Sequence, residues 1–460
     1  MLSTRGIIQR LLTNLGSARE VDQYLRQYGS VDAARFALIK VGGAVVKDDL
    51  ANLASALSFL NQVGLTPIVI HGAGEQLDEA LKQEGIESTR KDGMRITTPQ
   101  ILEIARRVFQ KVNLQLVEEL ESLGTRARPI TSGVFEAEVM AEGTYGLVGE
   151  VTEIHLEQVD SAIRSGHIPI LACLGETESG QILNINADVA ASELAVAVQP
   201  HKIVFLTPTG GLLDDKNRVI PAINLTEDYD NLMAQKWVSG GMRVKLMEIK
   251  ELLDRLPDTT SVSITSPDHL AKELFTHQGS GTLVRMGEQV RLFTSFDDVD
   301  TARLKTLLET CFGRPLAPDY FETKELDRLY LTDSHRATAI ITCEHSPLHP
   351  GAGEGPRARG NVLGPDIPYL DKFAVTLEAQ GQGLGASLWG RMRREVPRLY
   401  WRSRSGNPIN PWYFLQAGGC FRSDKWVVFW YGLDSYDEIR DCVERALALP
   451  ATFMEQAVAT

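Results

Sequence analysis

A short apolar stretch at residues 36–39 runs into a lysine and two glycines, and it constrains the fold more than any other feature of the chain. Lys40 follows the stretch directly, and Gly42 and Gly43 come after Val41. The pattern predicts a buried β-strand that ends in a tight turn, with a cation beside exposed backbone N–H groups. Such a turn suits a polyphosphate ligand. A glycine turn beside a solvated lysine is the simpler alternative.

The following segments predict a βαβ unit that begins with this strand. Leucines at helical spacing indicate a helix over residues 49–63, and residues 66–71 are typical of a second buried strand. That strand ends in another glycine-containing turn, His71-Gly72-Ala73-Gly74, with a helix predicted from Glu75. Because parallel strands end at one edge of a sheet, we expect the two turns to lie at the same edge.

Three charged residues farther along the chain are placed to join this edge. Arg95 lies in a predicted loop before a helix over residues 99–123, where its guanidinium either binds a carboxylate or is solvated. Asp188 stands at the start of an alanine-rich helix, where Asn or Asp is most often a cap. Lys245 is predicted in the first turn of a helix, where a cation opposes the helix dipole unless an anion binds nearby. Further strands are predicted over residues 168–174, 182–185, 202–206 and 261–264.

Five short motifs give residues 35–285 a resemblance to a known family, the amino-acid kinases, and within it to N-acetylglutamate kinase. They occur in the family's order: Lys40-x-Gly42-Gly43, His71-Gly72-Ala73-Gly74, Gly93-Met94-Arg95, Asn184-x-Asn186-Ala187-Asp188 and Gly241-Met242-x-x-Lys245. The resemblance implies an open, mainly parallel sheet sandwiched by helices. It also implies phosphorylation of the side-chain carboxylate of N-acetyl-L-glutamate by ATP with Mg²⁺.

The same resemblance implies roles for individual residues. Lys40 and Lys245 would stabilise the transferring phosphoryl group, and Asp188 would orient them. Arg95 and Asn184 would bind the substrate. The phosphates would lie at Gly42, Gly43, Gly72 and Ala73, with Gly43 and Gly72 donating backbone N–H groups. Many family members have glycine where this chain has Ala73, and a methyl group there is tolerated only if the turn has a negative φ.

A segment after residue 268 is similar to the arginine-binding segment of feedback-inhibited kinases of this family. The residues concerned are His269, Glu273, Gly279, Gly281 and Thr282. By this likeness Glu273 would pair with the cationic groups of an L-arginine effector. An amphipathic helix followed by a turn is an equally good interpretation of the spacing.

The C-terminal part shows a second strand, glycine turn and helix. A strand predicted over residues 369–377 leads into the turn Gln380-Gly381-Gln382-Gly383-Leu384-Gly385. Such a turn forms an anion site, and it resembles the pyrophosphate motif of GNAT acetyltransferases, whose donor is acetyl-CoA. Arg402 and Arg404 would share one face of a later strand, where a dicarboxylate such as L-glutamate would relieve their repulsion. An exposed edge strand is the alternative.

Residues 300–453 resemble the acetyltransferase domain of N-acetylglutamate synthases that are fused to a kinase-like domain. The resemblance implies that Lys372, Phe373, Arg402 and Arg404 contact glutamate. Asn407 would hold the amine or polarise the thioester. Tyr413 would protonate the leaving thiolate.

The charge balance limits the partners of this 460-residue chain. Its net charge of −13, without a basic block, argues against nucleic acid and anionic membranes. No apolar run reaches the roughly 20 residues that span a bilayer. Five scattered cysteines predict a reducing compartment. We predict no metal site, because Cys343, His345 and His349 lie in a Gly/Pro-rich segment that lacks a fourth ligand.

Taken together, the patterns predict three parts: an N-terminal helical segment (1–30), an amino-acid-kinase domain (31–290) and a smaller α/β GNAT domain (291–460). We expect a bifunctional enzyme of arginine biosynthesis that makes and phosphorylates N-acetyl-L-glutamate. The rivals are a synthase whose kinase-like domain only binds arginine, and an aspartate- or glutamate-kinase relative with an unrelated acetyltransferase. We expect a cytoplasmic homo-oligomer, with a tetramer favoured. An arginine-bearing N-terminus without acidic residues also suits import into the mitochondrial matrix.

Overall fold

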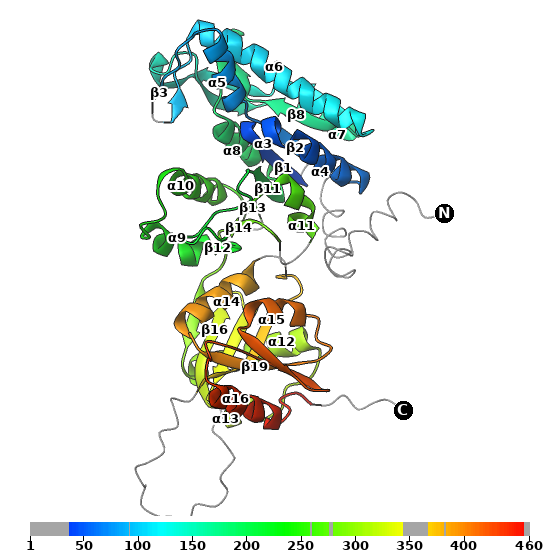
Figure 1. Cartoon of the computed structure of the whole chain (residues 1–460), viewed down its shortest axis with the longest axis vertical. Coiled ribbons are helices and arrows are strands. Elements are labelled where there is room, and N and C mark those ends of the chain that lie inside the picture. The colour runs from blue at the N-terminus through cyan, green and yellow to red at the C-terminus, as the bar shows by residue number, and fades with distance from the viewer. Residues whose placement is uncertain are drawn as a thin grey trace, which may run out of the picture. The chain divides into compact units, whose positions relative to one another are not determined.

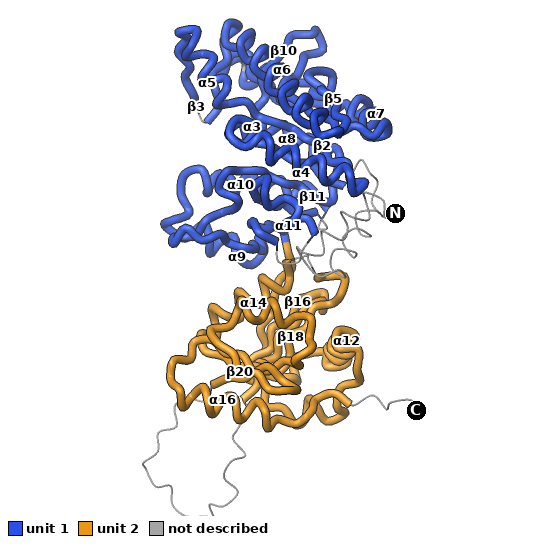
Figure 2. Tube along the Cα trace, turned by 45° about the vertical axis from the view of Figure 1, so that its right-hand side comes forward, with its two compact units in different colours: residues 1–286 blue, residues 287–460 orange. Residues whose placement is uncertain are grey.

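The computed structural model describes residues 36–91, 93–257, 260–275, 279–343, 367–380 and 383–454. The chain divides between Met286 and Gly287 into two compact units (Figure 2). Several sequence predictions lie outside the described residues: the N-terminal helical segment, Gly381, Gln382, His345 and His349.

The first unit is built on an eight-stranded sheet (Figure 1). Its strand order is β12 (Ala222–Asn224), β14 (Thr282–Arg285), β13 (Ser261–Thr265), β11 (Lys202–Leu206), β1 (Ala37–Val41), β2 (Ile68–His71), β8 (Ile168–Ala172) and β5 (Ala127–Ile130). All neighbours are parallel except β13 and β14. Every residue of β1, β2, β8, β11 and β13 is buried, so both faces of the sheet are covered. The predicted open, mainly parallel α/β sheet is confirmed.

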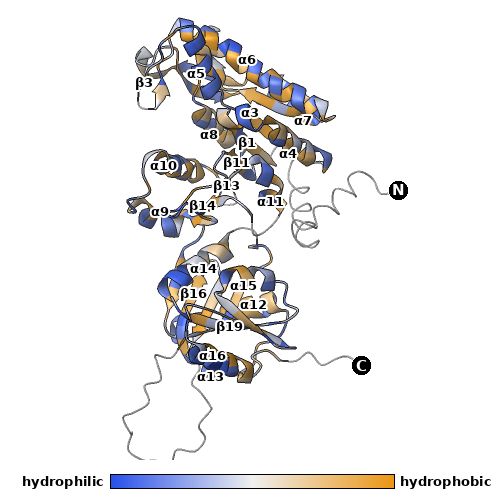
Figure 3. Cartoon of the chain, in the orientation of Figure 1, coloured by the Kyte–Doolittle hydropathy of each residue, from blue (hydrophilic) through white to orange (hydrophobic). Residues whose placement is uncertain are grey.

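Helices connect and cover these strands. They are α3 (Gly43–Asp48), α4 (Leu50–Gln62), α5 (Gly74–Gln83), α6 (Pro99–Ser122), α7 (Glu157–Arg164), α8 (Ala187–Val198), α9 (Leu225–Met233), α10 (Gly240–Asp254) and α11 (Leu270–Phe275). The side chain of Thr98 caps the start of α6 by accepting from the Ile101 N–H. Figure 3 shows polar and apolar residues alternating around α6, whose buried residues contact the hydrophobic core.

Three details of this unit differ from prediction. The helix predicted over residues 49–63 is present as α4 (Leu50–Gln62), but a short additional helix, α3, begins before it at Gly43. Arg95 is part of the short strand β4 (Met94–Arg95), which pairs with β3 (Arg90–Lys91), and not of a loop. Lys245 is the sixth residue of α10 and therefore lies in its second turn. Because the dipole effect is concentrated in the first turn, it opposes Lys245 less than expected.

A four-stranded sheet forms a second layer of this unit. Its order is β10 (Ile182–Asn184), β9 (Leu174–Glu176), β6 (Phe135–Val139) and β7 (Gly149–Ile154). The single strand predicted over residues 168–174 is thus divided between β8 in the large sheet and β9 in the small one. This division carries the chain from one sheet to the other and brings Asn184, at the end of β10, to the carboxyl edge of the large sheet.

The second unit contains a seven-stranded sheet with helices on both faces. The order is β15 (Val290–Phe293), β16 (Leu326–Thr332), β17 (Ala337–Thr342), β18 (Tyr369–Val375), β19 (Leu399–Arg404), β21 (Trp426–Tyr431) and β20 (Gly419–Arg422). The helices are α12 (Thr301–Phe312), α13 (Tyr320–Thr323), α14 (Leu384–Glu395), α15 (Asn410–Gln416) and α16 (Tyr436–Ala448). One face packs on α14 and α15, and the other packs on α12, α13 and α16.

Two predictions about these strands are wrong. β18 ends at Val375, and Leu377 beyond it is 53% exposed rather than part of the apolar face. β19 lies between β18 and β21, so the alternative that Arg402 and Arg404 sit on an exposed edge strand is excluded. In the described part of the chain, no helix has the length and apolar character needed to cross a membrane.

Candidate active sites

A cavity of about 240 Å³ opens at the carboxyl ends of β1 and β2. Lys40 and Asp188 line it, together with both glycine turns and with Arg95 and Asn184. The turn residues in its wall include Gly42, Gly43, Gly72 and Ala73. Residues from four separate sequence motifs therefore meet in one place, as the shared sheet edge predicts.

Two lysines and one aspartate form a charged group at this edge. The Nζ atom of Lys40 lies 2.7 Å from Oδ1 of Asp188. The Nζ atoms of Lys40 and Lys245 lie 6.0 and 5.5 Å from the centroid of the Phe205 ring. Burial opposes ionisation of Asp188, but Lys40 and Lys245 outweigh it and lower the pKa of the carboxyl. Burial and the charge of Lys40 lower the pKa of Lys245.

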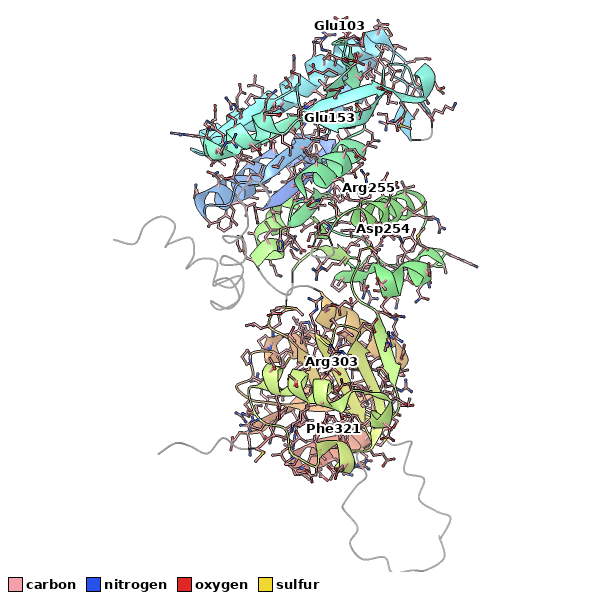
Figure 4. All side chains as sticks on the ribbon, turned by 180° about the vertical axis from the view of Figure 1, so that it is seen from behind. Glu103, Glu153, Asp254, Arg255, Arg303 and Phe321 are labelled. Carbon is pink, nitrogen blue, oxygen red and sulfur yellow. The ribbon has the colours of Figure 1, made fainter. Side chains whose placement is uncertain are left out.

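The helices that carry these groups are fixed relative to one another. The side chain of Asn186 caps α8 by accepting from the Asp188 N–H at 2.7 Å, which leaves the Asp188 carboxylate for Lys40. Arg255, at the end of α10, donates to both carboxylate oxygens of Glu193 on α8 at 2.7 and 2.8 Å (Figure 4 labels Arg255). This bidentate pair joins the helix of Asp188 to the helix of Lys245.

The glycine turns differ in what they offer to a ligand. Gly43 is the first residue of α3, where an N–H group has no acceptor within the helix. A Cβ at Gly43 would lie 3.1 Å from the backbone nitrogen of Gly74, so the close approach of the two turns leaves little room for a side chain. The Gly72 N–H donates to the Val41 carbonyl at 2.9 Å, so this predicted phosphate donor already has an acceptor. Ala73 has φ −141°, at which its methyl group is unstrained.

Arg95 and Asn184 face the same cavity from β4 and β10. The Arg95 side chain is only 6% exposed and lies 2.6 Å from Oδ1 of Asp78, so the solvated alternative is wrong. Its guanidinium also donates to Oγ of Ser88 at 2.5 Å. The Asn184 amide donates to Oγ1 of the buried residue Thr97 at 3.1 Å. We did not single out Thr97 from the sequence, although it lies two residues after Arg95.

In the segment with effector-like sequence, Glu273 contacts the described end of the turn that precedes β14. Oε2 of Glu273 accepts from the N–H groups of Ser280 and Gly281 at 2.9 and 3.1 Å. Gly279 has φ +58°, and a Cβ there would lie 2.6 Å from the same oxygen. Burial lowers the pKa of Lys202 to about 8, although Glu273 acts in the opposite direction. Glu273 is therefore an internal partner of this turn, and the interpretation as a plain amphipathic helix is incomplete.

The other two residues of this segment also make internal contacts. Nδ1 of His269 lies 3.0 Å from Oγ of Ser266. Thr282 is fully buried at the start of β14, and its Oγ1 accepts from the Leu212 N–H at 2.8 Å. Gly281 approaches β13 closely, since a Cβ would lie 2.1 Å from the Ile264 carbonyl oxygen. These contacts attach the turn to the sheet edge.

In the second unit, β18 and β19 are parallel neighbours that diverge. Only Tyr369 and Tyr400 are registered as a pair between them. Gly383 is the N-cap of α14 and has φ +78°, a conformation that favours glycine. Gly385 lies against Phe373 and Val375, and a Cβ there would be 3.3 Å from Val375. Gln380 donates to the Val375 carbonyl at 3.3 Å, and Leu384 is buried.

Lys372 and Phe373 project to opposite faces of this sheet, as successive strand residues must. Nζ of Lys372 lies 2.5 Å from Oδ2 of Asp371 and 2.7 Å from Oγ1 of Thr452. Phe373 instead stacks on Trp412 on the α14 face, with the ring centroids 5.7 Å apart. The side chains of Lys372 and Phe373, both predicted to contact glutamate, therefore do not meet at one site.

A second cation, Lys324, lies near Asp371, and the sequence patterns did not predict this contact. Nζ of Lys324 lies 3.8 Å from Oδ1 of Asp371, and the Tyr320 hydroxyl donates to Oδ2 at 2.6 Å. Burial opposes ionisation of Asp371, but the two lysines outweigh it and lower its pKa. Two cations thus lie beside the Asp371 carboxylate. The available sequence signal was an Asp-Lys pair in an otherwise apolar strand.

Arg402 has internal partners, whereas Arg404 is exposed. The Arg402 guanidinium donates to the carbonyls of Ala446, Leu449 and Pro450 at 2.6 to 2.8 Å, at the C-terminus of α16. The guanidinium carbons of Arg402 and Arg404 lie 4.3 and 5.6 Å from the Trp426 ring centroid. The repulsion between the arginines therefore does not by itself require a dicarboxylate.

Asn407 and Tyr413 lie on the turn and helix after β19. Asn407 donates to Oγ of Ser403 at 2.9 Å and shapes the turn. The ring of Tyr413 packs against Trp389, Trp401 and Phe429, and burial raises the pKa of its phenol. The phenol is therefore neutral and protonated at physiological pH.

One group of possible metal ligands was also missed. Glu136 on β6, Glu153 on β7 and His155 directly after β7 bring their ligand atoms within 4.8 Å of one another. The His155 ring lies 3.1 Å from Glu136, and this contact raises the histidine pKa. The paired carboxylate and imidazole satisfy each other, so the group is explained without a cation.

Comparisons with known proteins decide the family. Residues 35–266 match the model of the amino acid kinase family. This chain belongs to that family. Residues 291–448 match the N-acetyltransferase domain of N-acetylglutamate synthase, so this family member carries an acetyltransferase domain after its kinase domain.

Two relatives align along nearly the whole chain. The acetylglutamate kinase of Xanthomonas campestris is 51% identical over 96% of this chain and 100% of its own length. The mitochondrial N-acetylglutamate synthase of Homo sapiens is 32% identical over 98% of this chain and 79% of its own. The N-acetylglutamate synthase of Neisseria gonorrhoeae, solved with coenzyme A and N-acetyl-glutamate, shares the fold with a TM-score of 0.56 at 18% identity, over 90% of this chain and 98% of that one.

Proposed function

We propose that the chain catalyses two successive reactions. The second unit would transfer acetyl from acetyl-CoA to the α-amine of L-glutamate. The first would phosphorylate the side-chain carboxylate of the product with ATP. The observation that carries the kinase proposal is the meeting of Lys40, Asp188 and Lys245 at the glycine turns. Support for both activities comes from the relatives, which bear the name of one activity or the other while sharing most of this chain.

In the kinase unit, catalysis would rest on positioning and charge. Lys40 and Lys245 would neutralise the charge of the transferring phosphoryl group, with Asp188 keeping Lys40 in place. The attacking carboxylate is ionised at neutral pH, so no general base is needed. Asp188 is the one carboxylate among the described cavity-lining residues and is paired with Lys40. Mg²⁺ would therefore be held mainly by the phosphate oxygens of ATP, whose charge it would neutralise.

In the acetyltransferase unit, the diverging strands and the start of α14 would hold acetyl-CoA. The α14 N-terminus with Gly383 and Gly385 offers N–H groups to the pyrophosphate. Glutamate would bind on the opposite face, where Lys372, Lys324 and Arg402 place cationic groups near one another. Arg404 would add an exposed guanidinium at the same face.

Proton transfer would involve the protonated phenol of Tyr413. It would supply a proton to the sulfur of coenzyme A as the tetrahedral intermediate collapses. Asn407 would hold the amine or polarise the carbonyl. Phe373 would contribute apolar packing beside the diverging strands.

L-Arginine would act at the turn after α11, to which Glu273 is hydrogen-bonded. Gly279 has φ +58° and Gly281 approaches β13 too closely for a side chain, which fixes the described end of the turn at residues 279–281. Glu273 is a buried carboxylate that could pair with the effector's cationic groups, and His269 and Thr282 flank it. The neighbouring Lys202 could bind the effector's carboxylate.

We further propose a cytoplasmic homo-oligomer, with a tetramer favoured. The bacterial origin of the 51% identical relative supports the cytoplasm, whereas the human relative is described as mitochondrial. Size-exclusion chromatography with light scattering would measure the subunit number.

The proposal is tested by assaying the purified full chain for both reactions. We expect ADP formation that depends on N-acetyl-L-glutamate, and coenzyme A release that depends on L-glutamate. L-Arginine should lower at least one of these rates. Coenzyme A release without any ADP formation would identify a synthase with a silent kinase-like domain and reject the bifunctional proposal.

A further inference from the structure

We infer that Thr97 is a positioning residue for the acceptor substrate of the kinase, acting through Asn184. This inference rests on the proposed kinase function. Thr97 is fully buried, whereas Asn184 and Arg95 line the cavity. The buried hydroxyl of Thr97 would thus determine which atoms of the Asn184 amide face the cavity.

The hydrogen bonds of Thr97 allow only one orientation of the Asn184 amide. Oγ1 of Thr97 lies 3.0 Å from the Arg95 carbonyl oxygen, which can only accept, so the hydroxyl hydrogen is committed there. Towards Asn184, at 3.1 Å, the hydroxyl can therefore only accept. The atom facing Thr97 must be Nδ2, which leaves Oδ1 and the second N–H of Asn184 for the cavity.

The backbone around Thr97 makes this orientation rigid. The Thr97 N–H donates to the Tyr145 carbonyl at 2.9 Å, and the Thr97 carbonyl accepts from Leu147 at 2.7 Å. The Leu147 carbonyl in turn accepts from the Asn184 N–H at 3.0 Å. Gly146 has φ +70°, and a Cβ there would lie 2.3 Å from the Thr97 carbonyl oxygen. Residues 145–147 therefore connect Thr97 to the backbone of Asn184.

The fixed amide matches an N-acylated amino acid. Oδ1 of Asn184 can accept from the amide N–H of the substrate, and the remaining Nδ2 hydrogen can donate to a substrate carboxylate or acyl oxygen. A reversed amide would direct N–H groups at the substrate N–H. Thr97 is hydrogen-bonded both to the backbone of Arg95 on β4 and to the side chain of Asn184. It therefore holds together the two residues that would bind the acceptor substrate.

The test removes the hydroxyl while keeping the shape of the side chain. Thr97→Val should raise the KM for N-acetyl-L-glutamate about tenfold, since one hydrogen bond contributes roughly that factor. The kcat and the KM for ATP should stay within about twofold, and Thr97→Ser should restore the parent KM. The matched control is Thr125→Val, which removes a buried hydroxyl bonded to Ser58 at 2.6 Å, away from the described cavity lining. It should lower the melting temperature without changing the KM.

A double-mutant cycle distinguishes positioning of the Asn184 amide by Thr97 from a general loss of order in the cavity. In an Asn184→Ala background, Thr97→Val should raise the KM no further, because its effect passes through the missing amide. Additive effects, or equal increases in the KM values for ATP and for N-acetyl-L-glutamate, would overturn the inference.

Two further measurements distinguish a failure of this inference from a failure of Thr97→Val to fold and from a failure of the proposed kinase function. If Thr97→Val does not fold, Asn184→Asp provides the test, because its carboxylate competes with the Arg95 carbonyl for the Thr97 hydrogen. Its KM for N-acetyl-L-glutamate should rise at least tenfold, and an unchanged KM would reject the inference. A parent chain that forms no ADP with N-acetyl-L-glutamate would reject the proposed kinase function itself.

Discussion

At the residue scale, burial sets the protonation state of groups near both sites. The Tyr413 phenol keeps its proton because desolvation raises its pKa. His71, fully buried at the end of β2, has its pKa lowered by desolvation to about 4, and its Nε2 has no hydrogen-bond partner among the described residues. Both side chains are therefore neutral at pH 7.

Substitution of Tyr413 tests whether its phenol acts in acetyl transfer. Tyr413→Phe should lower kcat by about 10²- to 10⁴-fold while the KM for glutamate changes little, because only a transition-state interaction is lost. Arg404→Ala should show the opposite pattern, since Arg404 would act in substrate binding. Steady-state kinetics of coenzyme A release measures both. A kcat for Tyr413→Phe within about twofold of the parent would assign Tyr413 to packing with Trp389 and Trp401 alone.

His71 should make the stability of the kinase unit depend on pH. Its pKa is lower in the folded state (about 4) than the ordinary value of 6.5, so the unfolded chain binds the proton first as the pH falls. Stability should be full above pH 6.5 and should decrease towards pH 4, by up to about 3 kcal/mol from this residue. In His71→Gln, the urea midpoint for loss of kinase activity should fall less steeply over this range. The control His167→Gln replaces a half-buried histidine outside the hydrophobic core and should keep the parent slope.

At the element scale, binding of the arginine effector would depend on the turn before β14, which is hydrogen-bonded to α11. The turn between α11 and β14 is closed by Glu273, which accepts two backbone hydrogen bonds. Removing a buried acceptor leaves N–H groups unsatisfied at a cost of about 1–3 kcal/mol each. A test of effector binding at this turn must therefore separate the charge of Glu273 from its hydrogen bonds.

Glu273→Gln separates the two contributions. The glutamine oxygen can still accept from Ser280 and Gly281, but the negative charge is gone. We expect inhibition by arginine to weaken at least tenfold, with the uninhibited rates and the melting temperature near those of the parent. Glu273→Ala should lose both arginine sensitivity and stability, and the surface control Glu118→Ala should lose neither. An unchanged inhibition constant for Glu273→Gln would place the effector elsewhere.

At the scale of the whole molecule, the hydrophobic clusters and the candidate sites of the described residues divide between the two units. The kinase residues belong to the unit that ends at Met286, and the acetyltransferase residues belong to the unit that begins at Gly287. Within the described residues, each site is built from one unit alone. The two proposed reactions should therefore respond separately to substitutions.

Lys40→Ala tests this separation. It should abolish ADP formation, because it removes the partner of Asp188 and the cation that we propose lies beside the transferring phosphoryl group. Acetylation of glutamate should remain within about twofold of the parent. Lys47→Ala, which removes a lysine paired with Glu79 at the surface, should leave both reactions intact. Equal loss of both reactions in Lys40→Ala would contradict a model with two independent sites.

The sequence by itself determined where the main buried strands lie along the chain, the two-part organisation and most of the kinase cavity. The buried runs ending at Val41 and His71 are local apolar patterns, and parallel pairing then places the turns after them at one edge. Motif residues at such turns are recognisable because their backbone requirements are local. These patterns place Lys40 and Asp188 at one site, and the resemblance to the amino-acid kinases adds Arg95 and Asn184; all four line the cavity.

Only the tertiary structure decided which polar groups already have partners. Arg402 binds the C-terminus of α16, Glu273 closes its own turn, and the Gly72 N–H bonds to Val41. The pairings of Lys324 with Asp371 and of Thr97 with Asn184 join residues 47 and 87 positions apart. Hydrogen bonds and ion pairs act over a few ångströms, and local periodicity carries no information about which distant segments come that close.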